Sequence, residues 1–439
     1  MKWIVMLTMP LLAPGTAGAA GARDRFGGWP DVRGKATGYF HTEQIAGVWW
    51  LITPEGNAFF SKGVNNVSYA ADFAPALGYA PYGRVTQAKY GSAGKWAAAV
   101  ADRLRGWGFN SVGSWSSQEM QTQQMPYVVI ANMAASAGAN WQHGELADVF
   151  APRFDAALRQ QAEKVCAPHA GDPFLLGYFT DNELRWGADW RSKKTLLDEF
   201  LARPADAPGR QAALALMRAR YATVEALNAA LGTQLKSLDE LATLTALPTG
   251  NRGVQELQEA FQREYARHYF QGCREAILAA DPNHLLLGCR FAGYAPAPVV
   301  EAMGPYVDVV SFNNYDPLPP KAKLASLAAT TGKPVALTEF SFKAQDAGLP
   351  NSHGAGRPVA TQQDRADRFD AYLSALAKMP FVVGFHWFEY ADEPAEGRFD
   401  GENSNYGLVN LKDEPWQILV ERMTRVNAGL ETLHQAAAR

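Results

Sequence analysis

The stretch GYFTDNELRWG, residues 177–187, joins the end of an apolar run to two acids and an amide. The run begins at Pro173 as PFLLGYF, a length and composition typical of a fully buried β-strand. The polar residues Asp181, Asn182 and Glu183 follow at once. Carboxylates at the end of a buried strand indicate a parallel sheet whose carboxyl edge carries a site.

Seven further runs have the same design, apolar at the start and polar or aromatic at the end. Segments with helical periodicity lie between several of them, for example GKWAAAVADRLRGWG before Phe109. Eight strands that alternate with helices predict an α/β fold of the (β/α)8 TIM-barrel type, and a doubly wound sheet is the alternative. The eight runs start at Phe59, Phe109, Met125, Pro173, His284, Val307, Lys333 and Phe381.

Two additions to this barrel are expected. The segment VWWLITPEGNAFF, from Val48, predicts an N-terminal β-hairpin that turns at Pro54 to Asn57. Residues 188–283 are rich in helix formers and far exceed a simple crossover, so they predict a helical insertion after strand four. We therefore expect a single catalytic domain over residues 21–439.

The N-terminus has a composition of its own. Lys2 precedes an apolar run from Trp3 to Ala13, and small residues follow with an Ala-x-Ala-like cleavage site. This pattern predicts a secretory signal peptide over residues 1–20 and export to the periplasm or the medium. No later apolar run is long enough to span a bilayer, so no membrane association is expected once the signal is removed.

Composition limits the partners. The 439 residues carry a formal charge of −3 without a basic stripe, so a nucleic-acid partner is not expected. The eight histidines show no paired metal-ligand spacing, and neither a metal nor another cofactor is predicted. Three cysteines allow one disulfide or three thiols. The oligomeric state is left open.

A pair of glutamates is the strongest chemical signal. Glu183 ends the fourth predicted strand and Glu339 ends the seventh, in ALTEF. At the mouth of a barrel the two carboxyl groups face each other, and hydrolysis of a glycoside needs such a pair: an acid for the leaving oxygen and a carboxylate for the anomeric carbon. We therefore predict catalysis by Glu183 and Glu339 on a carbohydrate substrate.

Other strand ends supply candidate substrate contacts. Tyr315 is placed to hydrogen-bond Glu339, Trp387 to pack under a sugar ring, and Asn182 to donate to a sugar 2-hydroxyl. Each of these residues also has a purely structural interpretation: Tyr315 as a rim aromatic, Trp387 as a core tryptophan and Asn182 as a turn cap. Further candidates for hydroxyl recognition are Asn65, Asn66, Trp115, Asn132, Arg290 and His386.

These motifs carry a family resemblance. The Asn-Glu of TDNE and the Glu of LTEF resemble the retaining (β/α)8 enzymes of glycoside hydrolase clan A. VVSFNNYDPLP, KPVALTEFSF and HWFEYADEPAEGRFDGENSNYGLV are similar to the exo-acting β-agarase family, which is related to β-galactosidases. The resemblance implies cleavage of β-galactosides by double displacement, with Glu183 as acid/base and Glu339 as nucleophile.

Departures from the family bear on substrate. Phe340-Ser341-Phe342 stands where the family tends to have a histidine, and Glu389 stands where it has a glutamine. We therefore count Glu389 among the candidate specificity residues. Another β-glycoside specificity, transglycosylation and a silent polysaccharide-binding barrel are the alternatives, and exo or endo action is left open.

Overall fold

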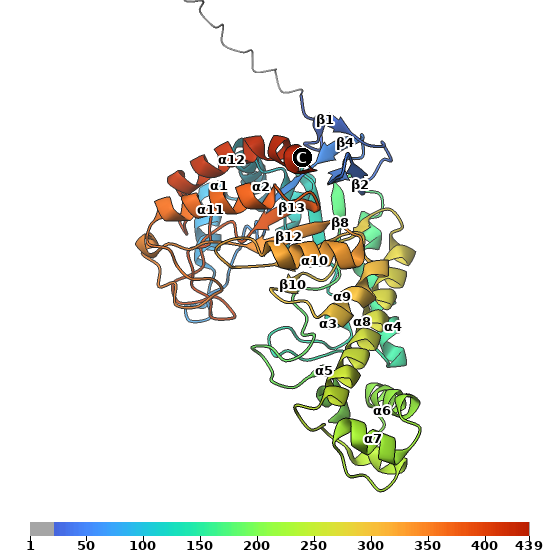
Figure 1. Cartoon of the computed structure of the whole chain (residues 1–439). Helices are drawn as coiled ribbons and strands as arrows, with labels where there is room; N and C mark the ends of the chain where they lie inside the picture. The colour runs from blue at the N-terminus through green and yellow to red at the C-terminus, as the bar shows by residue number, and fades with distance from the viewer. Residues whose placement is uncertain (1–21, 439) are drawn as a thin grey trace, which may run out of the picture.

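The computed structural model describes residues 22–438, so the predicted signal peptide lies outside the described residues. Two sheets organise this part of the chain (Figure 1). The larger has nine strands, and every neighbouring pair in it is parallel. Its order is β10 (Phe291–Ala292), β11 (Val310–Asn313), β12 (Val335–Phe340), β13 (Val382–Trp387), β5 (Ser61–Val64), β6 (Ser111–Val112), β7 (Tyr127–Ile130), β8 (Leu175–Phe179) and β9 (Leu285–Leu286).

The prediction of a closed (β/α)8 barrel was wrong, although the α/β class is confirmed. The strand order has two ends, β9 and β10, which are consecutive in the chain. HLLLGCRF was expected to be one strand, but Gly288 has φ 79° and Arg290 has φ 53°. A β-strand requires negative φ, so this left-handed turn splits the run into two short edge strands. A doubly wound sheet is not found either, because the strand order never reverses as that fold requires.

The smaller sheet is antiparallel and covers the amino ends of the parallel strands. Its order is β1 (Trp29–Arg33), β4 (Asn57–Phe59), β3 (Val48–Ile52) and β2 (His41–Ile45), so the expected hairpin is present as β3 and β4. The Trp49 amide donates to the Pro380 carbonyl, just before β13. A buried apolar cluster joins the N-terminal region to the parallel strands. Its members include Phe26, Phe40, Leu51 and Phe59 from the first and Val128, Leu176, Val309 and Val383 from the second. Burial of each such side chain stabilises the fold by about 1.5–3 kcal/mol.

Helices cover the flanks of the parallel sheet. α11 (Gln362–Leu376) packs on α12 (Gln417–Gln435) on one flank (Figure 1). On the other flank α8 (Arg252–Ala280) packs on α4 (Pro152–Val165) and α9 (Ala297–Met303). Local signals set their starts: Thr361 and Asp364 form a capping box on α11, and Ser92 caps α2. The helices outside the β8–β9 connection are α1 (Pro81–Tyr90), α2 (Ala93–Gly106), α3 (Met133–Ser136), α4 (Pro152–Val165), α9 (Ala297–Met303), α10 (Lys321–Thr331), α11 (Gln362–Leu376) and α12 (Gln417–Gln435).

The connection between β8 and β9 is helical. It contains α5 (Leu196–Leu201), α6 (Pro208–Arg220), α7 (Val224–Leu231) and α8 (Arg252–Ala280), and α6 and α7 lie at the end of the molecule far from β1 (Figure 1). The treatment of 188–283 as an insertion within one domain stays a prediction. Short 3-10 turns occur at Gln118–Thr122, Ala167–His169, Leu238–Thr243, Gly304–Tyr306, Gln345–Ala347 and Ala436–Ala438.

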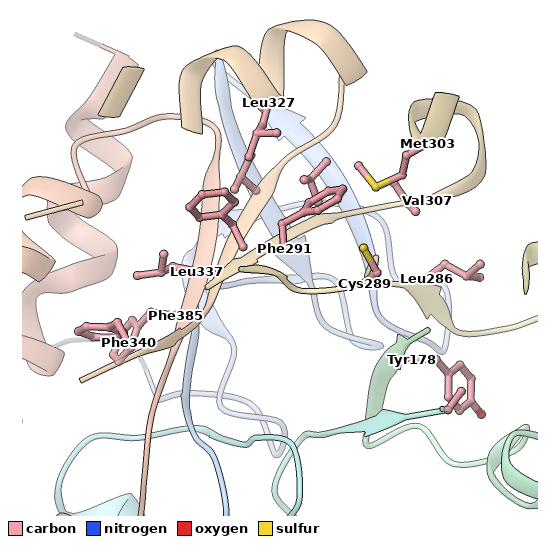
Figure 2. Packing of buried hydrophobic residues seen from close by; sticks show 14 of the residues in the cluster. Tyr178, Leu286, Cys289, Phe291, Met303, Val307, Leu327, Leu337, Phe340 and Phe385 are labelled. Carbon is pink, nitrogen blue, oxygen red and sulfur yellow. The ribbon is translucent and has the colours of Figure 1, made fainter. Parts of the chain in front are cut away.

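The main core lies between the helices and the parallel strands. Figure 2 shows Met303 of α9 and Leu327 of α10 in one buried cluster with Phe291, Leu337 and Phe385 of the strands. Cys166, Cys273 and Cys289 are buried free thiols, so the open question of a disulfide is settled for these three. A packed core of this kind fixes the strand ends, and with them the side chains that follow.

Candidate active site

Four chemistry-bearing residues meet at the carboxyl edge of the parallel sheet. Glu339 lies in β12 and Asn313 ends β11, and the two are register partners across these neighbouring strands. Glu183 follows β8, and Arg290 stands in the turn between β9 and β10. In open parallel sheets the carboxyl ends of the strands line the ligand crevice. The fold therefore gathers side chains from residues 183 to 339 in one place.

One amide connects the two glutamates. Asn313 Nδ2 donates to Glu183 Oε1 at 3.0 Å and to Glu339 Oε2 at 3.2 Å. Thr338 Oγ1 donates to Asn313 Oδ1 at 2.9 Å, which turns the amide so that its NH₂ group faces the carboxyl groups. The two carboxyl oxygens are therefore no farther apart than the sum of the two bonds, about 6 Å.

Glu339 has donors on both oxygens. Arg290 forms an ion pair with Oε2, and the Tyr315 hydroxyl donates to Oε1 at 2.7 Å. Burial and the negative charge of Glu339 hold the pKa of Tyr315 well above its usual value, so the phenol keeps the proton that it donates. These contacts fix the position of both oxygens of Glu339. The predicted contact between Tyr315 and Glu339 is present.

Glu183 has the opposite environment. Burial, followed by the negative charge of Glu339, raises the pKa of Glu183 to about 7. It accepts its hydrogen bond from a neutral amide, whereas Glu339 is paired with a guanidinium. A buried carboxyl group with a raised pKa beside a carboxyl group that is paired with a guanidinium is an arrangement suited to acid–base chemistry.

Arg290 holds several residues of the site in place. Its side chain is fully buried, Nε donates to Asn182 Oδ1 at 2.8 Å, and Nη1 donates to Ser114 Oγ at 2.6 Å. Its guanidinium also lies 4.5 Å from the centre of the Trp115 ring. Asn182 is thereby fixed by its oxygen, which leaves its NH₂ group as the end able to donate to a ligand.

Backbone strain is concentrated here. Nine non-glycine residues in the described part of the chain have positive φ, and five of them are predicted site residues. Such conformations cost of order 1–3 kcal/mol and cluster at functional sites. They turn the chain sharply at the strand ends and so aim the side chains of Asn66, Trp115, Asn132, Glu183 and Arg290.

A cavity of about 1240 Å³ opens over the two glutamates. Its volume exceeds the usual range for small-molecule sites, about 300–1,000 Å³, and suits a ligand of more than one sugar ring. Trp141, Trp190 and Phe388 add aromatic surface to its wall. The predicted residues that line it are Asn66, Trp115, Asn132, Asn182, Glu183, Tyr315 and Glu339.

The other predicted residues lie behind the cavity wall. Trp387 is fully buried among Phe340, Phe342 and Phe369, and its indole donates to the Tyr406 carbonyl. Its ring is a core ring because neighbouring aromatics already cover it, so the structure does not bring it under a sugar.

Two polar candidates are also occupied elsewhere. Asn65 is buried and bonds the Thr338 carbonyl and the Ser114 amide. His386 is buried against Ser61, and burial together with Arg290 lowers its pKa to about 3, so it is neutral. Both side chains therefore stabilise the ends of the strands that carry the site residues.

Glu389 is also fully buried. Its Oε2 accepts from Asn66 Nδ2, and Arg398 Nη1 lies 3.8 Å away. Burial and the nearby Asp72 carboxylate raise the pKa of Glu389 well above its usual value. Any influence on a ligand therefore passes through Asn66 and Arg398, which line the cavity.

The sequence reasoning missed Asn313, Ser114 and the role of Asp181. Asn313 stands two positions before Tyr315 at the polar end of the predicted strand in VVSFNNYDPLP, so its position in the sequence is a usable signal. Asp181 turns away from the glutamates, accepts from the Ala134 amide at 2.9 Å and thereby caps α3. Burial raises the pKa of Asp181 to about 7.

Two features are absent from residues 22–438. These residues contain no group of three or more side chains arranged to hold a metal ion. None of their helices is both long and apolar enough to cross a membrane.

Known proteins resemble the chain over most of its length. No sequence profile of a protein family matches it. β-Agarase B of Vibrio sp. (strain JT0107) is 29% identical over 92% of the chain, and the chain covers 50% of that protein. The chain thus spans about half the length of the curated relatives it matches.

Solved structures agree in fold. The structure of an exo-β-agarase matches with a TM-score of 0.84 at 28% identity, covering 94% of this chain and 68% of that one. The crystal structure of an agarase matches with a TM-score of 0.82 at 30% identity, covering 95% and 68%. Together with a paired-carboxyl site, these similarities show that the chain belongs to the glycoside hydrolases that are related to the β-agarases.

Proposed function

We propose that this protein cleaves β-linked galactosides of the agar type with retention of configuration. The observation that carries the proposal is the shared amide of Asn313, which holds Glu183 and Glu339 against one another in unlike environments. The two oxygens that share the amide lie within about 6 Å of each other, which is compatible with the direct attack of a retaining enzyme, whose carboxyl groups lie about 5–5.5 Å apart.

The proposed reaction has two steps, and Glu183 and Glu339 have different roles in each. In the first, Glu339 attacks the anomeric carbon while Glu183 donates its proton to the departing glycosidic oxygen, and a glycosyl-enzyme ester forms. In the second, a water attacks the same carbon, Glu183 takes its proton, and the bond to Glu339 breaks. Arg290 and Tyr315 stabilise the Glu339 carboxylate before the attack and after its release.

The relatives support agar as the substrate, since they are β-agarases. A cavity lined by Trp115, Trp141 and Trp190 supports a carbohydrate ligand, because the C–H faces of sugar rings pack on aromatic rings. Other β-galactosides remain the alternative substrate class. We also propose export, on the composition of residues 1–20, and N-terminal sequencing of secreted protein tests it.

Proton NMR of the first product tests the mechanism. We expect the initial product of a β-linked substrate to be the β-anomer, and an initial α-anomer would overturn the proposal. Glu339→Ala should abolish turnover. Glu183→Ala should slow substrates with poor leaving groups most, because leaving groups of low pKa need little protonation. A screen on agarose oligomers, β-galactosides and β-glucans, read by chromatography, tests the substrate.

A further inference from the structure

Three basic side chains of the cavity wall have no acidic partner. Lys323 belongs to α10, Arg357 to the loop between β12 and α11, and Arg368 to α11. All three residues are exposed, and none of them forms an ion pair within residues 22–438. The chain as a whole carries a formal charge of −3, so unpaired positive charges that gather at one cavity mark a site for a negative ligand.

The acids that are close to Arg368 in the sequence have other partners. Asp364 completes the capping box of α11 with Thr361. Asp367 lies 2.7 Å from Arg422 of α12 and forms an ion pair with it. Neither carboxylate is therefore available to neutralise Arg368, although both belong to the same helix.

The acids of the cavity wall are also engaged. Arg398 Nη2 lies 2.9 Å from Asp400 Oδ2 and 2.7 Å from Glu402 Oε2, so these two carboxylates already have a cation. Asp316, in the connection from β11 to α10, accepts from Asn314 Nδ2 at 3.0 Å. One acid against three bases leaves the cavity positively charged beside the segments that follow β11 and β12.

The backbone on both sides of Arg357 is fixed. The Tyr406 hydroxyl donates to the Ala355 carbonyl, and the Val359 amide donates to the Lys343 carbonyl at 2.8 Å. A loop that is held in place before the ligand arrives presents its side chain at a lower entropic cost.

The same loop approaches the catalytic residues at Gly356. This glycine has φ 73°, and a β-carbon added to it would lie 3.6 Å from Cβ of Tyr315. Tyr315 in turn donates to Glu339 Oε1 at 2.7 Å. Arg357, the next residue, therefore starts beside the side chain that holds Glu339, so a group bound by Arg357 belongs to a sugar close to the reacting one.

Lys323 occupies an unfavourable position for a free cation. It lies with Lys321 in the first turn of α10, and this turn contains no acidic residue. The first turn of a helix carries a partial positive charge, which repels cations and favours anions. Departures from local rules of this kind concentrate at functional sites.

We propose that Lys323, Arg357 and Arg368 bind an oxyanion substituent, a sulfate ester or a carboxylate, on the galactan that enters the cavity. The inference rests on the proposed function and narrows its substrate to an acidic galactan. Ammonium and guanidinium groups form charge-assisted hydrogen bonds with oxyanions, and arginine binds them in a bidentate geometry. Hydrogen bonds to a neutral hydroxyl are weaker, so three unpaired cations favour the charged substrate.

Monosaccharide binding tests the site independently of hydrolysis. Isothermal titration calorimetry of the whole chain compares galactose 6-sulfate, galacturonate and neutral galactose. We expect at least one of the two anions to bind about tenfold more tightly than galactose at low salt. Salt screens exposed charges, so this advantage should shrink in about 0.5 M sodium chloride. The anion that binds more tightly identifies the substituent. Failure of both anions to bind more tightly than galactose would overturn the site.

Variants connect the binding to these residues. Arg357→Ala should reduce the advantage of the preferred anion over galactose by about threefold or more, and Arg357→Lys should keep part of it. The matched control is Arg425→Ala, because Arg425 is an exposed arginine of α12 that does not line the cavity and has no ion pair within residues 22–438. The control should leave the affinities of all three sugars unchanged.

Kinetics test the substrate class. An agarose oligosaccharide is compared with the same oligosaccharide carrying one sulfate ester or one carboxylate. In the double variant Arg357→Ala, Arg368→Ala, the ratio of kcat/KM for the charged substrate to kcat/KM for the neutral one should fall by about tenfold. An unchanged ratio would overturn the inference while the proposed function stands. A wild-type chain that cleaves none of these oligosaccharides would overturn the proposed function, and the calorimetry then decides the anion site by itself.

Discussion

Glu183 and Glu339 accept hydrogen bonds from the same nitrogen atom, Nδ2 of Asn313. The amide therefore holds the two carboxyl groups close together without adding a charge. A lysine there would pair with both acids and lower both proton affinities. Because the amide is neutral, the difference between the two glutamates comes from the burial of Glu183 and from the ion pair of Glu339 with Arg290.

Loss of the Asn313 amide should reduce turnover with little effect on folding. Asn313→Ala removes a donor to each glutamate, and loss of one preorganised donor at a reacting centre typically costs about 100–1,000-fold in kcat. We expect a fall of roughly this size, measured by steady-state kinetics. Ser352→Ala, at an exposed residue that does not line the cavity, is a control. A kcat within about threefold of wild type would show that Asn313 is not needed.

The pH profile should report Glu183. In the proposed mechanism the first step needs the proton of Glu183, and burial raises the pKa of this group to about 7. As pH rises through this value the carboxyl group loses the proton, so kcat/KM should fall on the alkaline side with an apparent pKa near 7, a value that belongs to the coupled pair. Glu183→Gln should remove this limb on substrates with good leaving groups. An unchanged limb in that variant would assign it to another group.

Glu389→Gln should change substrate preference more than fold stability. The carboxyl group is buried behind Asn66 and Arg398, both of which line the cavity. A glutamine offers an N–H in place of one acceptor, so Asn66 and Arg398 must rearrange. We expect altered ratios of kcat/KM among galactosides, with a similar midpoint of thermal unfolding. Constant ratios would remove Glu389 from the specificity residues.

The strand runs and the two glutamates were predictable from the sequence because both are local patterns. The break at Gly288 and Arg290 was not, since HLLLGCRF reads as a continuous strand and only the backbone φ values reveal the turn. Trp387 shows a second limit. A tryptophan at a strand end lies under a ligand or in the core according to its neighbours, here Phe342 and Phe369, which are distant in sequence.

A buried ion pair joins the first strand of the parallel sheet to the last helix, and it should be a point of stability. Lys62 Nζ lies 2.7 Å from Glu431 Oε1, and both side chains are at most 3% exposed. Removal of one partner leaves an uncompensated buried charge, which costs about 3–5 kcal/mol. We expect Glu431→Ala to lower the free energy of unfolding by this amount, measured by urea titration. The double variant Lys62→Met, Glu431→Leu should lose less, because no buried charge is left unpaired; Arg23, the second partner of Glu431, is 38% exposed and can be solvated. A double variant as unstable as the single one would show that packing, and not charge, dominates this contact.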